Sequence, residues 1–233
     1  MQSPFEISVV IPTLDEAPTI TACLDSVGEH RGVEIVVADG GSTDDTRDLA
    51  RRRGVTIVEG RGGRGPQLNL GAAETSAERL LFLHADCRLP EGWLPAVIEA
   101  LEDPWTALAC FRLRTEPSGG GEVSGVRKAW LALLDIRSRG MRLPYGDQGL
   151  AVRREVYEGV GRFPEIPLME DLAFSKACRR VGRIKRLPLE IRTTARRYER
   201  RPVIARLINL VFPTLYGLGV SPNTLARWYR EVR

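Results

Sequence analysis

The sequence contains no uninterrupted apolar run of the length, about 18 residues, that a membrane-spanning helix requires. The nearest candidate, 203–220, is broken by Arg206, Asn209 and Pro213. The first residues enter an apolar segment at once, without the basic region and small-residue cleavage site of a signal peptide. These absences argue against an integral membrane protein and predict a cytoplasmic one.

Cysteine is also scarce. The four cysteines are separated by 64, 23 and 68 positions. These spacings exclude a C-x-x-C pair and the usual arrangement of zinc ligands. We therefore expect free thiols in the core at all four positions, which are Cys23, Cys87, Cys110 and Cys178.

The remaining composition is that of a globular protein, with 43% apolar and 27% charged residues among 233. This length provides one full core and a small appendage. The net charge of +4 hides an asymmetry, because residues 1–175 hold 19 basic and 27 acidic side chains, whereas residues 176–233 hold 15 basic and 3 acidic ones. Such a basic tail attracts phosphate, anionic lipid or nucleic acid, or forms a solvated charged face. Charge alone does not choose between these.

Apolar runs and helical patterns alternate along the first hundred residues. The expected strands are short, rich in Val, Ile and Leu, and covered on both faces; they are 7–11, 34–38, 56–58 and 80–83. The expected helices between them are 18–29, 44–53 and 67–76. Ser42 or Thr43 is expected to cap the second of these helices. The alternation predicts an α/β fold with a parallel sheet.

Beyond residue 104 the pattern loosens. We expect a strand over 107–115, a Gly-rich loop over 118–122, an amphipathic stretch over 123–139 and a helix over 171–181. Two helices, separated around 217–222, are expected in the tail.

Carboxylates gather just after the expected strands. Because ligands bind beyond the carboxyl ends of parallel strands, Asp15, Glu16, Asp39, Asp44, Asp45 and Asp86 would share one edge. Such crowding is costly unless a metal ion or hydrogen-bond donors offset it. The segment 61–71 begins with Gly62, Gly63 and Gly65 beside Arg61 and Arg64, ahead of a helix. This is typical of a phosphate cradle, although a flexible surface loop has the same composition.

Each of these motifs has an ordinary structural alternative. The string DGGSTDDT at 39–46 is also a well-capped turn before a helix, and Asp86 also serves as a simple cap. His84 is a metal ligand, a phosphate donor or a packed histidine. Glu170 and Asp171 open a helix, where acids either serve the helix dipole or supply a general base.

Six segments over residues 8–183 together resemble the family-2 glycosyltransferases with the GT-A fold. They are SVVIPTLDE, VVADGGSTDDT, RGGRGPQLNLGA, LLFLHAD, GDQGLAVRR and MEDLAFSKACRRVGR. The tail segments 193–203 and 219–229 resemble a subgroup of small bacterial members associated with arsenosugar biosynthesis. The resemblance implies a mostly parallel central sheet flanked by helices. It also implies a catalytic domain at 1–195, with a nucleotide-binding half at 1–104 and an acceptor half at 105–195, and a basic helical extension at 196–233.

The resemblance further implies an inverting displacement on a nucleotide-sugar donor, with UDP favoured and Mn²⁺ or Mg²⁺ as cofactor. Asp171 would be the base, with Glu170 on the acceptor side or in a positioning role. The metal would bind Asp86 and His84, where His84 replaces the first acid of the family's D-x-D string. The donor contacts would be Pro12, Thr13, Glu16, Asp39, Gly40, Arg64, Asn69 and Ala85, and the acceptor pocket would involve Gly146, Asp147 and Gln148.

Rival classes lack their own signatures. A nucleotidyltransferase requires a Gly-rich loop after the first strand, and a dinucleotide oxidoreductase requires G-x-G-x-x-G there, but the sequence has PTLDE. A non-catalytic nucleotide-sugar sensor would not need Asp171. The expected partners are a nucleotide-sugar donor and a small-molecule or lipid-linked acceptor, without nucleic acid. The tail is expected to pack on the catalytic domain or on a second subunit, with docking at the inner membrane face as the alternative.

Overall fold

The structure is a computed structural model that describes residues 3–117, 143–196 and 211–232. The expected Gly-rich loop at 118–122 and amphipathic stretch at 123–139 lie outside the described residues. All four cysteines are described, and they are free and buried as predicted.

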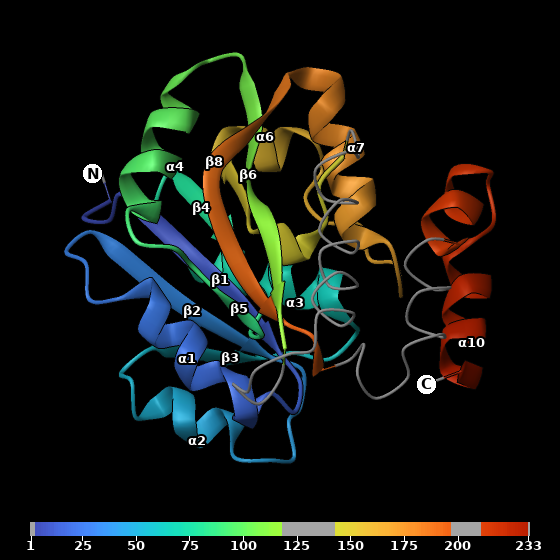
Figure 1. Cartoon of the computed structure of the whole chain (residues 1–233), viewed down its shortest axis with the longest axis horizontal. Coiled ribbons are helices and arrows are strands. Elements are labelled where there is room, and N and C mark those ends of the chain that lie inside the picture. The colour runs from blue at the N-terminus through green and yellow to red at the C-terminus, as the bar shows by residue number, and fades with distance from the viewer. Residues whose placement is uncertain (1–2, 118–142, 197–210, 233) are drawn as a thin grey trace.

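One sheet of eight strands organises the chain, in the order β3-β2-β1-β4-β7-β6-β8-β5 (Figure 1). Its first four strands run parallel and match the expected ones within about two residues; they are β1 (Ile7–Thr13), β2 (Val33–Asp39), β3 (Thr56–Glu59) and β4 (Arg79–Phe82). The connecting helices are α1 (Ala17–Val27), α2 (Thr46–Arg51) and α3 (Arg64–Ala73). The predicted α/β half is confirmed.

The second half of the sheet is mixed. The expected strand near 107–115 is β6 (Thr106–Glu116), and β7 (Leu150–Arg153) lies antiparallel between β4 and β6. Three strands of this half were not predicted. They are β7 itself, β8 (Arg183–Thr194), which is parallel to β6, and the short β5 (Cys87–Arg88), which is antiparallel to β8. The remaining elements are α4 (Trp93–Glu102), the 3-10 turn η1 (Gly146–Gln148), α6 (Arg154–Gly159) and α7 (Glu170–Val181).

Helices cover both faces of the sheet. Alternate residues of β1 belong to different cores, because Ile7, Val9 and Ile11 pack with α1 and α4, whereas Val10 packs with α3 and α7. Helix α3 approaches β1 closely, since a Cβ on Gly71 would lie 2.5 Å from Val10 Cγ1. The sheet is therefore buried on both sides, and polar side chains are left at the strand ends.

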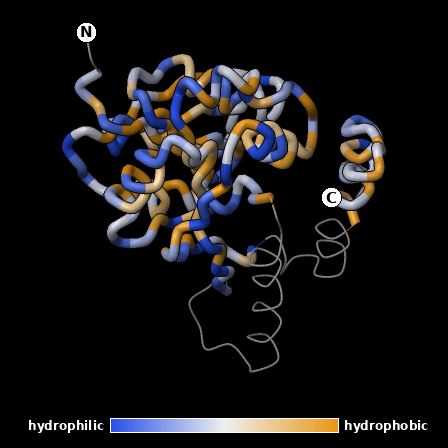
Figure 2. Tube along the Cα trace, turned by 90° about the horizontal axis from the view of Figure 1, so that it is seen from above, coloured by the Kyte–Doolittle hydropathy of each residue, from blue (hydrophilic) through white to orange (hydrophobic). Residues whose placement is uncertain are grey.

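The described part of the tail packs on the main body. It contains a helical segment at 211–217 and α10 (Pro222–Val232). The two helices are separated where the sequence predicted a break. Phe212 and Leu225 are buried in one cluster with Tyr145, Met169 and Leu172, at the start of η1 and α7. Apolar and polar residues alternate along these helices (Figure 2). In the described residues, no helix is long and apolar enough to cross a membrane.

Candidate active site

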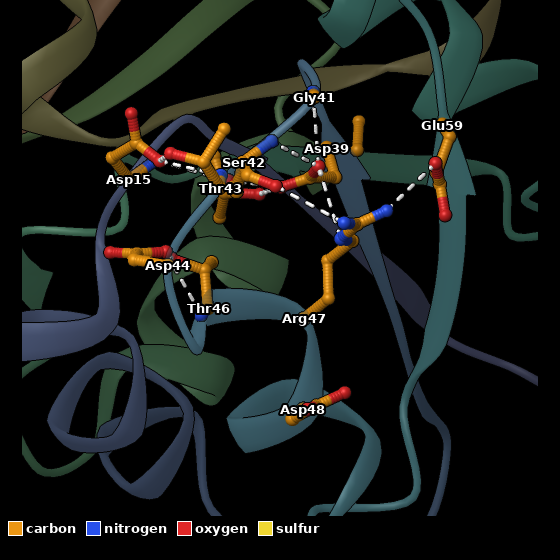
Figure 3. A network of polar contacts seen from close by, with 12 residues as sticks. Asp15, Asp39, Gly41, Ser42, Thr43, Asp44, Thr46, Arg47, Asp48 and Glu59 are labelled. Atoms are coloured by element: carbon orange, nitrogen blue, oxygen red, sulfur yellow. Dashed lines mark hydrogen bonds and ion pairs between the residues drawn. The ribbon is translucent and has the colours of Figure 1, made fainter.

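The loops after β1 and β2 are joined by hydrogen bonds (Figure 3). Asp15, in the left-handed region at φ 55°, accepts from Thr43 N over 2.8 Å and donates its own N–H to Ser42 Oγ over 3.0 Å. Asp44 Oδ2 accepts from Ala17 N over 3.1 Å. The two acidic motifs found in the sequence therefore form one rim at the carboxyl end of the sheet.

These same contacts overturn the predicted helix cap. Helix α2 begins at Thr46 after Asp45, and Asp44 Oδ1 accepts the Thr46 N–H over 3.0 Å. Partial burial would raise the pKa of Asp44, but the hydrogen bonds from Thr46 and Ala17 lower it. Ser42 and Thr43 do not cap the helix, because their hydroxyls are used by Asp39 and Asp15.

Asp39 is fully buried and organises the second loop. Its Oδ1 accepts from the N–H groups of Gly41 and Ser42 over 3.0 and 2.8 Å, and its Oδ2 accepts the hydroxyls of Thr13 and Ser42 over 2.9 and 2.5 Å. Burial would raise the pKa of Asp39, but these four donors outweigh it and hold the pKa below its usual value. The carboxylate is thus kept ionised within the loop itself.

A cavity of about 370 Å³ opens above this loop, within the usual size range of ligand sites. The loops after β2 and β3 line it, through Gly41, Ser42, Thr43, Arg47, Glu59, Gly60 and Arg61. Arg47 connects the loop after β2 to the end of β3. It donates to the Ser42 carbonyl and to Glu59 Oε2, each over 3.1 Å. Arg61 Nε lies beside Gly41, 3.5 Å from where a Cβ would stand.

Gln67 is a buried polar residue that the sequence reasoning missed. Its Nε2 donates to the carbonyls of Thr13 and Ala38 over 2.8 and 2.9 Å, which ties the start of α3 to the ends of β1 and β2. Gly40 is needed beneath it, because a Cβ there would lie 2.8 Å from Gln67 Nε2. The available signal was an uncharged polar residue inside the apolar pattern of α3.

Asn69 is placed differently from the prediction. Its Nδ2 donates to the Phe163 carbonyl over 2.8 Å, and its Oδ1 accepts from Phe163 N and from the Tyr157 hydroxyl over 3.0 and 2.8 Å. These three bonds use nearly all of the hydrogen-bonding capacity of the Asn69 amide. They hold the segment after α6 in place. We therefore no longer assign Asn69 to the donor site.

The Gly-rich segment and the Glu-Asp pair, predicted separately, meet in the fold. Arg64 Nη1 lies 3.1 Å from Glu170 Oε1, joining the first residues of α3 and α7. Gly65 permits the approach, since a Cβ would lie 2.5 Å from the Pro164 carbonyl. Glu170 is only 2% exposed, and its pKa is raised by burial and then by the Asp171 charge, with Arg64 opposing both.

Asp171 and His84 come together around Gly146. Asp171 Oδ2 accepts the Gly146 N–H over 2.9 Å, and Oδ1 accepts from Leu172 N over 2.7 Å. A Cβ on Gly146 would lie 2.4 Å from His84 Nε2 and 3.4 Å from Asp171 Oδ2. Three segments that are distant in sequence thus converge at the carboxyl end of β4.

Asp86 and Asp147 flank the buried Cys87. Its thiol donates to Asp86 Oδ1 at 3.7 Å and to the Asp147 carbonyl at 3.4 Å. Its pKa is raised by burial and then by the charges of these two aspartates. Gln148, predicted for the acceptor pocket, instead holds η1 in place by donating to the Phe111 carbonyl and accepting from Tyr145 N. We assign Gln148 a structural role.

This arrangement defines a class of protein. A mixed sheet whose parallel half ends in polar loops beside a ligand-sized cavity is the GT-A architecture of glycosyltransferases. The chain belongs to glycosyl transferase family 2, whose family model matches residues 8–161.

Individual relatives agree with this placement. Glycosyltransferase AglE of Haloferax volcanii is 27% identical over 169 residues, which are 68% of this chain and 56% of AglE. A PGL/p-HBAD biosynthesis glycosyltransferase of Mycobacterium bovis is 38% identical over 93 residues, 36% of each chain. The chain spans about half the length of the first of these curated relatives, and less of the second.

Solved structures share the fold. A mannosyltransferase from Pyrobaculum calidifontis, in complex with GDP-Man and Mn²⁺, has a TM-score of 0.60 at 23% identity, covering 82% of this chain and 59% of that one. Glucosyl-3-phosphoglycerate synthase from Mycobacterium tuberculosis, in complex with Mn²⁺, UDP and glucosyl-3-phosphoglycerate, has a TM-score of 0.51 at 25% identity, covering 81% and 70%.

Proposed function

We propose that the chain is an inverting glycosyltransferase that moves a sugar from a nucleotide-sugar donor to an acceptor hydroxyl. The observation that carries this proposal is the convergence of His84, Gly146 and Asp171, because it places a carboxylate opposite the strand end that bears Asp86. An inverting displacement needs only one such base and no protein nucleophile.

The nucleoside end of the donor fits the cavity between the loops after β2 and β3. Its volume suits a base and ribose, and its position leads the diphosphate toward Asp86 across the ends of β1 and β4. Solved relatives hold GDP-Man or UDP. We keep a UDP-sugar as the favoured donor. Pro12, Thr13, Gly40 and Ala85 stay predicted backbone neighbours of the donor.

The Asp86 carboxylate is the oxygen ligand that suits Mn²⁺ or Mg²⁺, whereas the His84 imidazole is a ligand that transition metals accept and Mg²⁺ does not favour. Among the described residues, no group of three or more His, Cys, Asp or Glu side chains is arranged to hold a metal. This fits an ion completed by diphosphate oxygens and water, for which one or two protein ligands suffice. Such an ion would offset the charge that develops on the departing diphosphate.

Asp171 is the proposed base, and Glu170 is not, because its buried carboxylate is committed to Arg64. Glu170 instead keeps α7 docked on α3. The acceptor would enter past Gly146 and Asp147. The apolar cluster of Tyr145, Met169 and Leu172 with the tail lies next to this entrance, which suits a small or lipid-linked acceptor with an apolar part.

Three finer predictions stay with this proposal. The tail motifs at 193–203 and 219–229 support the arsenosugar-associated subgroup. A homo-oligomer formed through the tail stays a prediction, as does docking at the inner membrane face. For the latter, the exposed Leu218 and Trp228 are the supporting feature, with the exposed Arg227 next to Trp228 in the sequence.

A thermal-shift screen of UDP- and GDP-sugars, with and without Mn²⁺ or Mg²⁺, tests the donor assignment. At about 100 times its dissociation constant, a ligand stabilises the folded state by roughly 2.7 kcal/mol, which raises the Tm by several degrees. We expect at least one nucleotide-sugar to do so, and the shift to grow with the metal. If none raises the Tm while unrelated nucleotides do, the proposed function is wrong.

A further inference from the structure

The chain leaving β8 is tied to the loop that follows β1. Arg196, two residues beyond the end of β8, donates Nη2 to Glu16 Oε2 over 2.6 Å. The Glu16 side chain is only 9% exposed and that of Arg196 is 25% exposed. This guanidinium is therefore a fixed cation at the rim of the sheet.

The β8 end of this link reaches the strand end that carries Asp86. Thr193, three residues before Arg196, pairs with Cys87 in the β5–β8 ladder. Its hydroxyl lies 3.5 Å from the Asp86 carbonyl. Arg196 therefore follows directly from the backbone that frames Asp86.

The Glu16 end of the link reaches the same place from the other side. The Cys23 thiol donates to the His84 carbonyl over 3.5 Å, so Cys23 lies under the end of β4. Cys23 belongs to α1, which begins directly after Glu16. Helix α1 therefore connects the Glu16–Arg196 ion pair to the strand end that leads to Asp86.

A donor diphosphate at Asp86 would bring several negative charges to a rim already lined by carboxylates. Arg64 is committed to Glu170 at the start of α7, and Arg47 and Arg61 line the cavity assigned to the nucleoside. A guanidinium matches phosphate oxygens in two-pronged geometry and is the usual partner for them. Arg196 can meet that need because its present partner is a carboxylate, an anion that phosphate can replace.

We propose that Arg196 binds the donor diphosphate, exchanging its bond to Glu16 for phosphate oxygens. Glu16 holds the guanidinium at the rim until the donor arrives. The inference rests on the proposed function, and it gives the first residue of the basic tail a direct part in donor binding.

Calorimetry with UDP and UMP, and with GDP and GMP, in the presence of Mn²⁺ tests this exchange. The affinity ratio of diphosphate to monophosphate isolates contacts to the terminal phosphate. Arg196→Gln should lower this ratio about 10- to 100-fold, the range for losing a charge-assisted hydrogen bond. Arg196→Lys should give an intermediate value, because it keeps the charge but not the two-pronged geometry.

Glu16→Gln should move the ratio in the opposite direction, raising it several-fold, because the competing anion is gone. The double variant should match Arg196→Gln alone, which shows that the gain passes through Arg196. The matched control is Arg192→Gln, which removes an exposed arginine of β8 whose Nη1 lies 3.4 Å from Glu116 Oε1. It should leave the ratio unchanged.

The outcomes separate cleanly. If the parent binds neither UDP nor GDP, the proposed function fails and the inference fails with it. If the parent binds a diphosphate but Arg196→Gln keeps the parental ratio, the inference alone is wrong. If both single variants lose diphosphate and monophosphate affinity equally, the inference is also wrong. The ion pair would then only hold the two segments together.

Discussion

Replacing Asp171 with Asn is expected to lower turnover about 10²–10⁴-fold while donor binding stays near that of the parent. The reason is that Asp171, as the proposed base, would take a proton in the transition state, whereas the proposed donor contacts lie on other elements. Asn keeps the shape of the side chain and one oxygen for the Gly146 N–H. The measurement is kcat with a confirmed acceptor, together with the donor-induced rise in Tm to verify that the site remains assembled.

Two comparison variants separate catalysis from helix capping. Glu170→Gln, one position earlier, should weaken the contact with Arg64. It should therefore lower the affinity for the acceptor more than it lowers kcat. Glu155→Gln removes an exposed acid from the first turn of α6 and controls for the loss of a helix-dipole interaction. If Asp171→Asn keeps a rate within a few-fold of the parent, the base lies elsewhere, and Asp147 is the next residue to replace.

Replacing Asp86 with Ala is expected to remove the effect of Mn²⁺ on nucleoside diphosphate binding. Losing only an outer-shell partner of a metal costs roughly 10–100-fold in metal affinity, so the loss of a direct ligand should exceed this. Isothermal titration of the parent should show weaker binding in EDTA than in Mn²⁺, whereas the variant should bind equally in both.

The matched control for Asp86 is Asp25→Ala. Asp25 lies on α1, away from the strand ends, and its exposed carboxylate pairs with Arg53. It should preserve the full response to Mn²⁺. A parent whose affinity is the same in EDTA and in Mn²⁺ would contradict the metal assignment and make His84 the better candidate for holding phosphate.

The sequence predicted the parallel half of the fold well because its signals are local. Each strand there is a short apolar run, and each is followed by a helix before its neighbour, so pattern and turn chemistry were sufficient. The rim of Asp15, Asp39 and Asp44 followed from one rule, that parallel strands present their carboxyl ends to a common edge.

The mixed half of the sheet depended on pairings between distant residues. Strand β8 alternates charged and apolar residues in a basic segment, and its pairing with β6 joins positions more than seventy residues apart. No local pattern specifies such contacts. The same limitation explains why Gln67 was missed and why the structural hydrogen bonds of Asn69 and Gln148 were not predicted, since each is defined by the carbonyl groups that the fold brings to it.

The most direct test of the account is a crystal structure of the chain with Mn²⁺ and the nucleotide that the thermal screen selects. The account predicts the base in the cavity between Gly41 and Arg61, the diphosphate with the metal at Asp86, and the sugar-bearing end directed at Asp171. A nucleotide bound elsewhere, or bound with its diphosphate directed away from Asp86 and Asp171, would contradict it.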